Sequence, residues 1–264
     1  MGEEMHEKKR VPAIRFAGFT EPWEQRKLSD YLSVSNEKNE DNCYGKKDVL
    51  SVSGSLGIIN QILFQGRSFA GTSVANYGIV HTHDIVYTKS PLKANPYGII
   101  KTNKGKTGIV STLYAVYTPK INVISDFIQI YFEQDARMNK YMHPLVNKGA
   151  KNDMKVSSEN ALKGEVIFPK KNEQKTISLF FDKLDNLITL HQRKCDELKK
   201  VKKSLLQKMF PKEGSVVPAV RFAGFTEAWE QRKLGDIADK VTEKNVGLQY
   251  IETFGKLQVE FEQP

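Results

Sequence analysis

The hydrophobic pattern of residues 23–170 predicts short strands separated by turns. Apolar and β-branched side chains alternate with polar ones over residues 49–53, 83–88 and 108–119, and Gly, Asn and Pro residues lie between these runs. Over 108–119 both alternating sets contain apolar side chains, which predicts one strand with both faces partly covered. From residue 122 to 142 the period becomes helical. The apolar positions that recur at helical spacing are Ile124, Phe127, Ile128, Tyr131 and Phe132.

One long helix is predicted after the strand that ends at Pro169. Asn172 is expected as its N-cap, and Glu173 lies in the first turn, where a carboxylate suits the helix dipole. No Gly or Pro interrupts the chain before Phe210. At a rise of 1.5 Å per residue such a helix is about 55 Å long. A single small domain does not cover a helix of this length.

The apolar positions of this helix predict a coiled-coil seam. Two heptad positions carry the seam residues, which are Ile177, Phe180, Leu184, Leu187, Leu198, Val201 and Leu205. His191 and Lys194 interrupt the seam midway. Because a lone amphipathic helix is poorly stable in water, we expect it to pair with a second helix, from the same chain or from another copy.

A long internal repeat divides the chain. Residues 11–30 and 217–236 match at 17 of 20 positions, the three changes being Ile14/Val220, Pro22/Ala228 and Ser29/Gly235. The spacing of 206 residues is too long for a solenoid unit, so each copy is expected to open a domain-sized module. The alternative is a local duplication without structural meaning.

Four segments follow from the repeat and the helix. The expected segments are a lead-in with the first repeat copy (1–22), a globular domain (23–170), the long helix (171–211), and a linker with the second copy and the start of a second domain (212–264).

Composition narrows the class of partner. The chain has 40 Lys and Arg against 31 Asp and Glu, a formal charge of +9 and a pI near 9.3, which favours a polyanion such as nucleic acid. Cys43 and Cys195 are too few for a disulfide framework or a metal cluster. No apolar run approaches the roughly 18 residues of a membrane span. We therefore expect a cytoplasmic protein with no membrane partner.

Catalytic and metal-binding patterns are not found in the sequence. Gly105, Lys106 and Thr107 resemble the end of a phosphate-binding loop, but Ile100 stands where that loop needs a Gly. His81 and His83 are more often a solvated pair than zinc ligands. The sequence thus predicts no catalytic residue and no metal site.

Two basic loops are the candidates for nucleic-acid contact. Residues 100–108 and 146–157 combine Lys with Asn, Gly and Ser or Thr, a mixture that reaches phosphates by charge and base edges through amides. Ordinary solvated loops have the same composition. The candidate residues are Lys101, Asn103, Lys104, Lys106, Thr107, Lys148, Lys151, Asn152 and Lys155.

The order of four motifs resembles one family, the specificity subunit of type I restriction-modification systems. Trp-x-x-x-x-Leu-x-Asp begins at Trp23, Gly-x-Val-Ser-x-x-Tyr-x-Val at Gly108, and Pro-x-x-x-Glu-Gln at Pro169, before the long helix. A second Trp-x-x-x-x-Leu-x-Asp begins at Trp229. The resemblance spans nearly the whole chain.

This resemblance implies an α+β fold, with a mixed, β-rich target recognition domain followed by a long coiled-coil helix. In the family, two recognition domains are joined by two helices that pack as an antiparallel coiled coil, and each domain reads half of a split DNA site. The helices set the spacing and bind modification subunits, and through them restriction subunits. The specificity subunit itself is expected to bind no cofactor and to catalyse nothing. S-adenosylmethionine, ATP and magnesium are expected only in the partner subunits.

The departure from the family is the short segment after the second repeat copy. Either the chain is a truncated product, or it is a half-subunit that forms a homodimer through the long helix, directed at an inverted-repeat bipartite site. The alternative function is that of a coiled-coil adaptor that does not bind DNA. A third interpretation, an enzyme acting on nucleic acid, lacks the expected catalytic residues.

Overall fold

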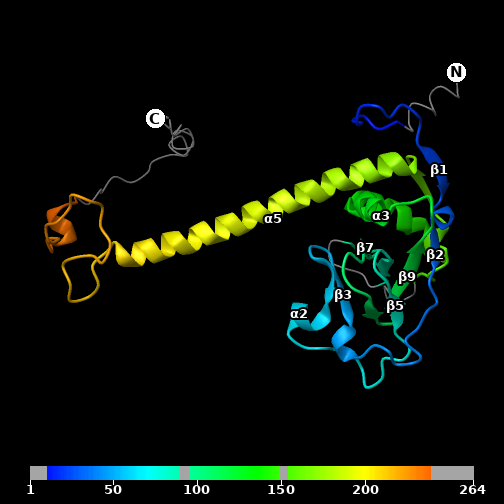
Figure 1. Cartoon of the computed structure of the whole chain (residues 1–264), viewed down its shortest axis with the longest axis horizontal. Helices are drawn as coiled ribbons and strands as arrows, with labels where there is room; N and C mark the ends of the chain where they lie inside the picture. The colour runs from blue at the N-terminus through cyan, green and yellow to red at the C-terminus, as the bar shows by residue number, and fades with distance from the viewer. Residues whose placement is uncertain (1–10, 90–94, 149–153, 239–264) are drawn as a thin grey trace, which may run out of the picture. The chain divides into compact units, whose positions relative to one another are not determined.

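The computed structural model describes residues 11–89, 95–148 and 154–238 of the chain (Figure 1). It divides into two compact units, with the boundary between Thr189 and Leu190. The first unit contains the strands and the shorter α-helices, and the α+β class expected from the sequence is confirmed.

A four-stranded antiparallel sheet forms the centre of the first unit, in the order β2-β9-β6-β7. Its strands are β2 (Leu32–Val34), β9 (Tyr114–Pro119), β6 (Ile85–Thr88) and β7 (Ile100–Thr102). All four residues of β6 are buried, because β9 and β7 cover its two edges and side chains pack on both of its faces. The prediction of a strand over 83–88 is confirmed for residues 85–88, while His83 lies in a turn with a φ of 72°.

Four two-stranded antiparallel sheets surround this centre. They pair β1 (Glu24–Lys27) with β12 (Glu165–Phe168), β3 (Leu50–Ser53) with β4 (Gly57–Asn60), β5 (Gly78–Val80) with β8 (Gly108–Val110), and β10 (Asn147–Lys148) with β11 (Met154–Lys155). Short 3₁₀ turns are η1 (Leu28–Asp30), η2 (Lys46–Asp48), η3 (His143–Leu145), η4 (Asn160–Leu162) and η5 (Leu234–Asp236). Strand β3 confirms the prediction for 49–53.

The single strand predicted over 108–119 is wrong. A turn separates β8 from β9, and in it the Tyr114 amide donates to the Ser111 carbonyl at 3.1 Å. Strand β8 pairs with β5, whereas β9 pairs with β2 and β6. Both halves of the run are apolar because they belong to two sheets, which pack together through Val80, Val86, Val110 and Val116.

The helical pattern over 122–142 forms two helices. Helix α3 (Ser125–Phe132) and helix α4 (Asp135–Met142) are separated at Gln134, whose ψ of 109° is extended. The break lets both helices pack against the large hydrophobic core, to which α3 contributes Phe127, Ile128 and Phe132 and α4 contributes Met138, Tyr141 and Met142. A further short helix, α2 (Gln61–Gln65), follows β4 directly.

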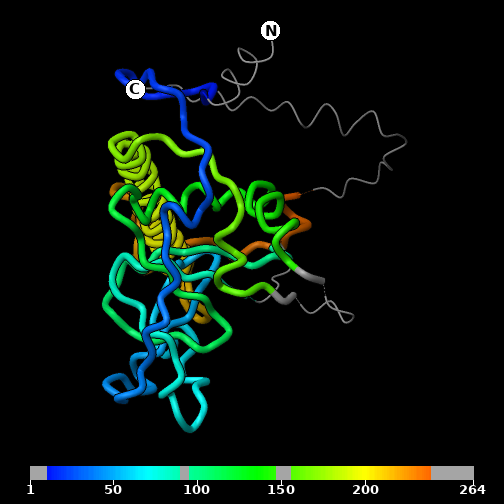
Figure 2. The backbone as a smooth tube through the Cα atoms, turned by 90° about the vertical axis from the view of Figure 1, so that its right-hand side faces the viewer, coloured from blue at the N-terminus to red at the C-terminus, as the bar shows by residue number. Residues whose placement is uncertain are grey.

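Helix α5 (Lys171–Lys208) is the long helix predicted from the sequence. Its 38 residues give a length of about 57 Å. It begins one residue before Asn172, so Asn172 lies inside the helix and is not its N-cap, while Glu173 lies in the first turn as predicted. Helix α3 runs beside the first turns of α5 (Figure 1). Figure 2 shows the N-terminal chain beside the segment that leads into α5, where β1 pairs with β12.

Candidate nucleic-acid interface

The first predicted basic loop, residues 100–108, contains strand β7, the connection 103–107 and the first residue of β8. The connection 103–107 is fastened to a neighbouring loop, residues 81–84. The side-chain amide nitrogen of Asn103 donates to the carbonyls of His81 at 3.0 Å and of Lys106 at 3.1 Å. Asn103 is 1% exposed. Its amide therefore holds the two loops together and is not free to face a ligand in this arrangement.

Backbone and carboxylate contacts complete this fastening. The His83 amide donates to the Asn103 carbonyl at 2.7 Å, and the Thr82 hydroxyl donates to the Gly105 carbonyl at 2.9 Å. Asp84 accepts a hydrogen bond from the His81 amide at 2.8 Å. Burial raises the pKa of the Asp84 carboxyl, and the hydrogen bond from His81 partly opposes this rise. The two loops thus form one preorganised unit.

Two predicted lysines of the first loop are engaged within the domain. Lys101 is buried, and its ammonium lies 3.1 Å from a carboxylate oxygen of Glu133. The Lys104 ammonium lies 2.5 Å from Asp182 of α5 and 3.6 Å from Asp126 of α3. Burial lowers the pKa of Lys104, but the two carboxylates outweigh this effect and raise it. Both side chains therefore link β7 and its loop to the helices.

Lys106 and Thr107 have different surroundings. Lys106 is exposed and Thr107 is half-buried. Gly108, which follows them, packs against the 3₁₀ turn η2, since a Cβ atom at Gly108 would lie 2.6 Å from the Asp48 carbonyl. The exposed side chains of Lys46 and Lys47 belong to that turn.

The structure thus brings three exposed lysines of distant segments to one edge of the domain. We call Lys46, Lys47 and Lys106 the basic edge. Among the residues that the structure describes, no carboxylate lies within 4 Å of these ammonium groups. Positive charges without an internal partner are available to phosphates.

Sequence reasoning missed Lys46 and Lys47 because nothing in their segment distinguishes it from a solvated turn. The turn is fixed at both ends by side chains. Asp48 accepts from the Gly45 amide at 2.8 Å, and the Asn60 side chain donates to the Lys47 carbonyl at 2.7 Å. The one signal in the sequence is Gly108, directly after the basic loop, because a glycine in a strand can mark a close approach of another backbone segment, here η2.

The second predicted loop lies on the short hairpin of β10 and β11. Val146 and Val156 flank this hairpin and are buried in the large core, at 8% and 6% exposure. The backbone places Lys148 in β10 and Lys155 in β11, while Lys151 and Asn152 lie outside the described residues.

No metal cluster is present in the described ranges, where no three His, Cys, Asp or Glu residues are grouped as ligands. His81 instead lies 2.8 Å from Glu37. Among the helices that the structure describes, none combines the length and the apolar character needed to cross a membrane.

A family model described as "Type I restriction modification DNA specificity domain" matches residues 20–200. The match covers the strand-rich unit and most of α5. This chain belongs to that family. The resemblance seen in the sequence motifs is confirmed, and members of the family are in general non-catalytic. Among curated protein sequences, none matches the chain.

Three solved structures are similar to this chain. One is the HsdS subunit from Thermoanaerobacter tengcongensis, 13% identical, with a TM-score of 0.48 over 76% of this chain and 53% of that one. Another is the type I restriction-modification S subunit from M. genitalium, 13% identical, with a TM-score of 0.42 over 72% and 46%. The third comes from a study of complex assembly and conformational transition in a type I system, 12% identical, with a TM-score of 0.42 over 80% and 52%. The chain spans about half the length of these structures.

In this specificity-domain chain, the Pro-x-x-x-Glu-Gln motif attaches α5 to the domain. Gln174 is fully buried, accepts from the Ile124 amide at 2.9 Å and donates to the Pro169 carbonyl at 2.9 Å. Glu173 is 2% exposed and accepts hydrogen bonds from Arg15 and Trp23 of the first repeat copy. The motif therefore fixes the start of the helix to α3 and to the repeat.

Most of the predicted seam of α5 is uncovered in the part of the chain that the structure describes. Ile177 packs against the large core. The other six seam residues are 37% to 56% exposed, namely Phe180, Leu184, Leu187, Leu198, Val201 and Leu205. Pairing through this seam remains a prediction.

Proposed function

We propose that residues 23–170 form a target recognition domain that binds double-stranded DNA and reads one half-site for a type I restriction-modification complex. The observation that carries the proposal is the basic edge, three unpaired lysines on a domain of the DNA specificity family. Lysines at such an edge contact phosphates and set the register of the domain on the duplex.

The fastened loops support this role for the basic edge. Lys106 lies on a loop held by Asn103, and η2 is held by Asn60 and Asp48. Ordering these lysines on binding therefore costs only side-chain entropy, because the backbone under them is already fixed. Base readout then falls to side chains on the neighbouring loops.

The test is the salt dependence of DNA binding by the full chain, measured by fluorescence anisotropy with a labelled random-sequence duplex of about 30 base pairs. Each phosphate contact contributes about 0.9 to the slope of log K against log salt. Replacing Lys46, Lys47 and Lys106 by Ala together is expected to lower that slope by about 3.

A matched control removes the same charge elsewhere on the same unit. Lys27, Lys163 and Lys175 are exposed, and their triple Ala variant is expected to change the slope by less than about 1. Equal losses in the two triple variants would contradict the basic edge as the interface. A wild-type chain without salt-dependent DNA binding would favour the coiled-coil adaptor function instead.

The proposal includes modification subunits as partners, and restriction subunits through them. Catalysis, with S-adenosylmethionine, ATP and magnesium, then belongs to those subunits. Exposed apolar side chains of α5 outside the seam, at Leu179, Ile188 and Leu190, support a docking role for the helix. Mixing the purified chain with a modification subunit is expected to give a complex by light scattering, and separate masses would contradict the docking role.

A homodimer through α5 is part of the same proposal. Two copies joined by a two-fold axis present two identical recognition domains, which suits an inverted-repeat bipartite site. Leu198, Val201 and Leu205, each at least 40% exposed, supply the apolar surface for the pair. A solution mass of one chain at concentrations well above micromolar would contradict the homodimer.

A further inference from the structure

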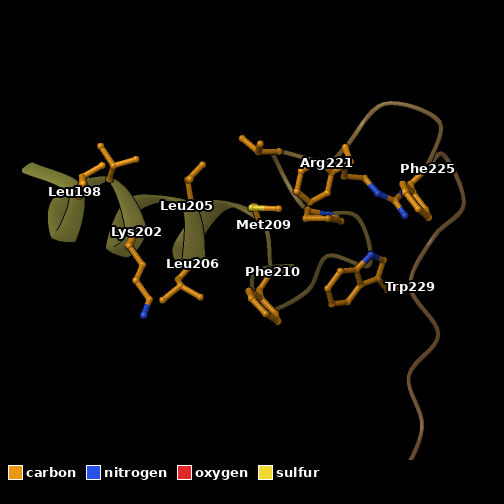
Figure 3. A pocket seen from close by; sticks show the side chains of 13 residues that line it. Leu198, Lys202, Leu205, Leu206, Met209, Phe210, Arg221, Phe225 and Trp229 are labelled. Carbon is orange, nitrogen blue, oxygen red and sulfur yellow. The ribbon is translucent and has the colours of Figure 1, made fainter. Parts of the chain in front are cut away.

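Each copy of the repeat lines an apolar pocket, and it does so with the same five positions. The first pocket, of about 850 Å³, is lined by Pro12, Ile14, Arg15, Phe16 and Trp23 among other residues. The second, of about 710 Å³, is lined by the matching Pro218, Val220, Arg221, Phe222 and Trp229 (Figure 3). The two copies therefore present the same surface.

In the first pocket this surface holds the start of α5. Arg15 donates two hydrogen bonds to the carboxylate of Glu173, both at 2.7 Å, and Trp23 donates a third at 3.3 Å. The ring of Phe16 packs edge-on against Phe180, with the centroids 5.4 Å apart. The first repeat copy is thus a clamp around a buried glutamate on a helix.

The second copy has the same turns as the first but has no such glutamate. Arg221 donates to the Glu227 carbonyl at 2.5 Å, as Arg15 does to the Glu21 carbonyl at 2.5 Å. Within the described ranges no carboxylate lies within 4 Å of Arg221. Phe222 is 71% exposed, and Trp229, which packs on Phe210, is 42% exposed.

We propose that the second repeat copy is a clamp for the start of α5 of another copy of this chain. Arg221 and Trp229 take the places of Arg15 and Trp23 on Glu173 of that other copy. Because 17 of the 20 repeat positions are identical, the second copy carries every donor and ring that the first clamp uses. This exchange of one identical element for another is domain swapping. The proposal is independent of DNA binding.

Chain length excludes the same interaction within one chain. From Glu173 to Lys208 the chain is helical and extends about 52 Å. The thirteen residues from Lys208 to Arg221 span at most about 45 Å when fully extended. The Val220 amide also donates to the Lys208 carbonyl at 3.0 Å, which holds Arg221 beside the C-terminal end of α5. With this contact in place the second clamp does not reach the Glu173 of its own chain while α5 is intact, and a second copy is required.

The second pocket also gives the direction of the approaching helix. Its other wall is the C-terminal part of α5, with Leu198, Val201 and Leu205 of the predicted seam. A helix whose first turn enters this pocket meets the last turns of the resident helix. The two α5 helices then lie antiparallel, with a clamp at each end of the pair.

The first clamp competes with the second for Glu173. Because the first clamp belongs to the same chain as its glutamate, it acts at a high effective concentration, of millimolar order for short flexible linkers. Exchange is therefore expected at high protein concentration, and it is expected to increase when the first clamp is weakened.

Thiol cross-linking in the full chain tests the proposal. In the first copy the Glu21 carboxylate lies 2.6 Å from the Lys170 ammonium, and Glu227 is the position that matches Glu21. Because an ion pair between two long side chains does not bring their Cα atoms to disulfide distance, a short flexible bismaleimide joins the two thiols. With Cys43→Ser and Cys195→Ser as background, Glu227→Cys and Lys170→Cys are expected to give cross-linked dimers, several-fold more of them when Arg15→Ala is added. Arg232→Cys with Lys170→Cys is the matched control, because the matching Arg26 lies in β1, about 16 Å farther along an extended chain.

Covalent dimers that form with Glu227→Cys and Lys170→Cys, and not with Arg232→Cys and Lys170→Cys, support the proposal. Equal yields from the Glu227 and Arg232 pairs, or no dimers from the Glu227 pair at high concentration, overturn it. Circular dichroism reports whether the Arg15→Ala variant keeps its helix. If that variant does not fold, the Arg15→Lys variant and the concentration dependence of the unweakened chain decide the same question.

Discussion

The two repeat copies are nearly identical in sequence and differ in structure. Residues 24–27 form strand β1, which pairs with β12 and places Glu24 opposite Phe168. The matching residues 230–233 are described and form no strand. Strand formation here depends on an available partner edge and not on the propensity of the four residues.

Other features are the same in both copies. Gly18 and Gly224 have φ angles of 92° and 91°, a backbone region that favours glycine. Leu28–Asp30 and Leu234–Asp236 both form 3₁₀ turns. Each of these features is built from neighbouring residues only. Local sequence therefore determines the turns, and the rest of the fold determines the strand and the buried ion pair.

The largest difference between the copies is expected at the two arginines. Arg15→Ala leaves the buried carboxylate of Glu173 without its cation, and this is expected to lower the free energy of unfolding by about 3 kcal/mol. Arg221→Ala is expected to change it by less than about 0.5 kcal/mol in dilute solution. Urea unfolding of the full chain followed by circular dichroism measures both.

A second substitution separates charge from packing. Adding Glu173→Gln to Arg15→Ala removes the unpaired charge and is expected to recover part of the lost stability. If the double variant is as unstable as Arg15→Ala, the loss comes from side-chain packing and not from the buried charge.

A smaller difference is expected at Trp23 and Trp229, the two tryptophans of the sequence. Trp23→Phe removes a hydrogen bond to a carboxylate and is expected to cost about 1.5 kcal/mol, whereas Trp229→Phe is expected to cost less than about 0.5 kcal/mol. The remaining tryptophan in each variant reports its own surroundings. Trp23 is expected to emit at shorter wavelength and to be quenched less by acrylamide than Trp229, and the reverse order would contradict the structure.

The smallest difference between the copies is expected at the glycines, where the two structures agree. An Ala at Gly18 or Gly224 meets no atom within 4 Å, so only the positive φ opposes it, at about 1 kcal/mol in either copy. Hydrogen exchange of peptides covering 11–23 and 217–229 is expected to increase about five-fold in both variants. A clearly unequal increase in hydrogen exchange between the two variants would show that the two turns are held by different contacts.

Several parts of the fold could be predicted because they depend on neighbouring residues. The helical period and the absence of Gly and Pro located the start of α5 correctly and its end within three residues, and the position of Glu173 in its first turn was correct. The motifs identified the family before the fold was known.

Other parts could not be predicted. A run that is apolar on both faces can form one strand or two. The period of residues 108–119 therefore does not show that β8 and β9 belong to different sheets. For Asn103, side-chain chemistry suggested base contact, but the loop packing uses its amide internally.

The sequence by itself determined the long helix and its apolar seam, the turns of both repeats and the family. The turns rest on interactions between neighbouring residues, and the helix on a long run without Gly or Pro. Only the tertiary structure decided which lysines are free. Lys104 meets carboxylates of α3 and α5, while Lys46, Lys47 and Lys106 meet none in the described chain. An ion pair between distant segments depends on how those segments pack, and that packing is not encoded in the type or spacing of the lysines themselves.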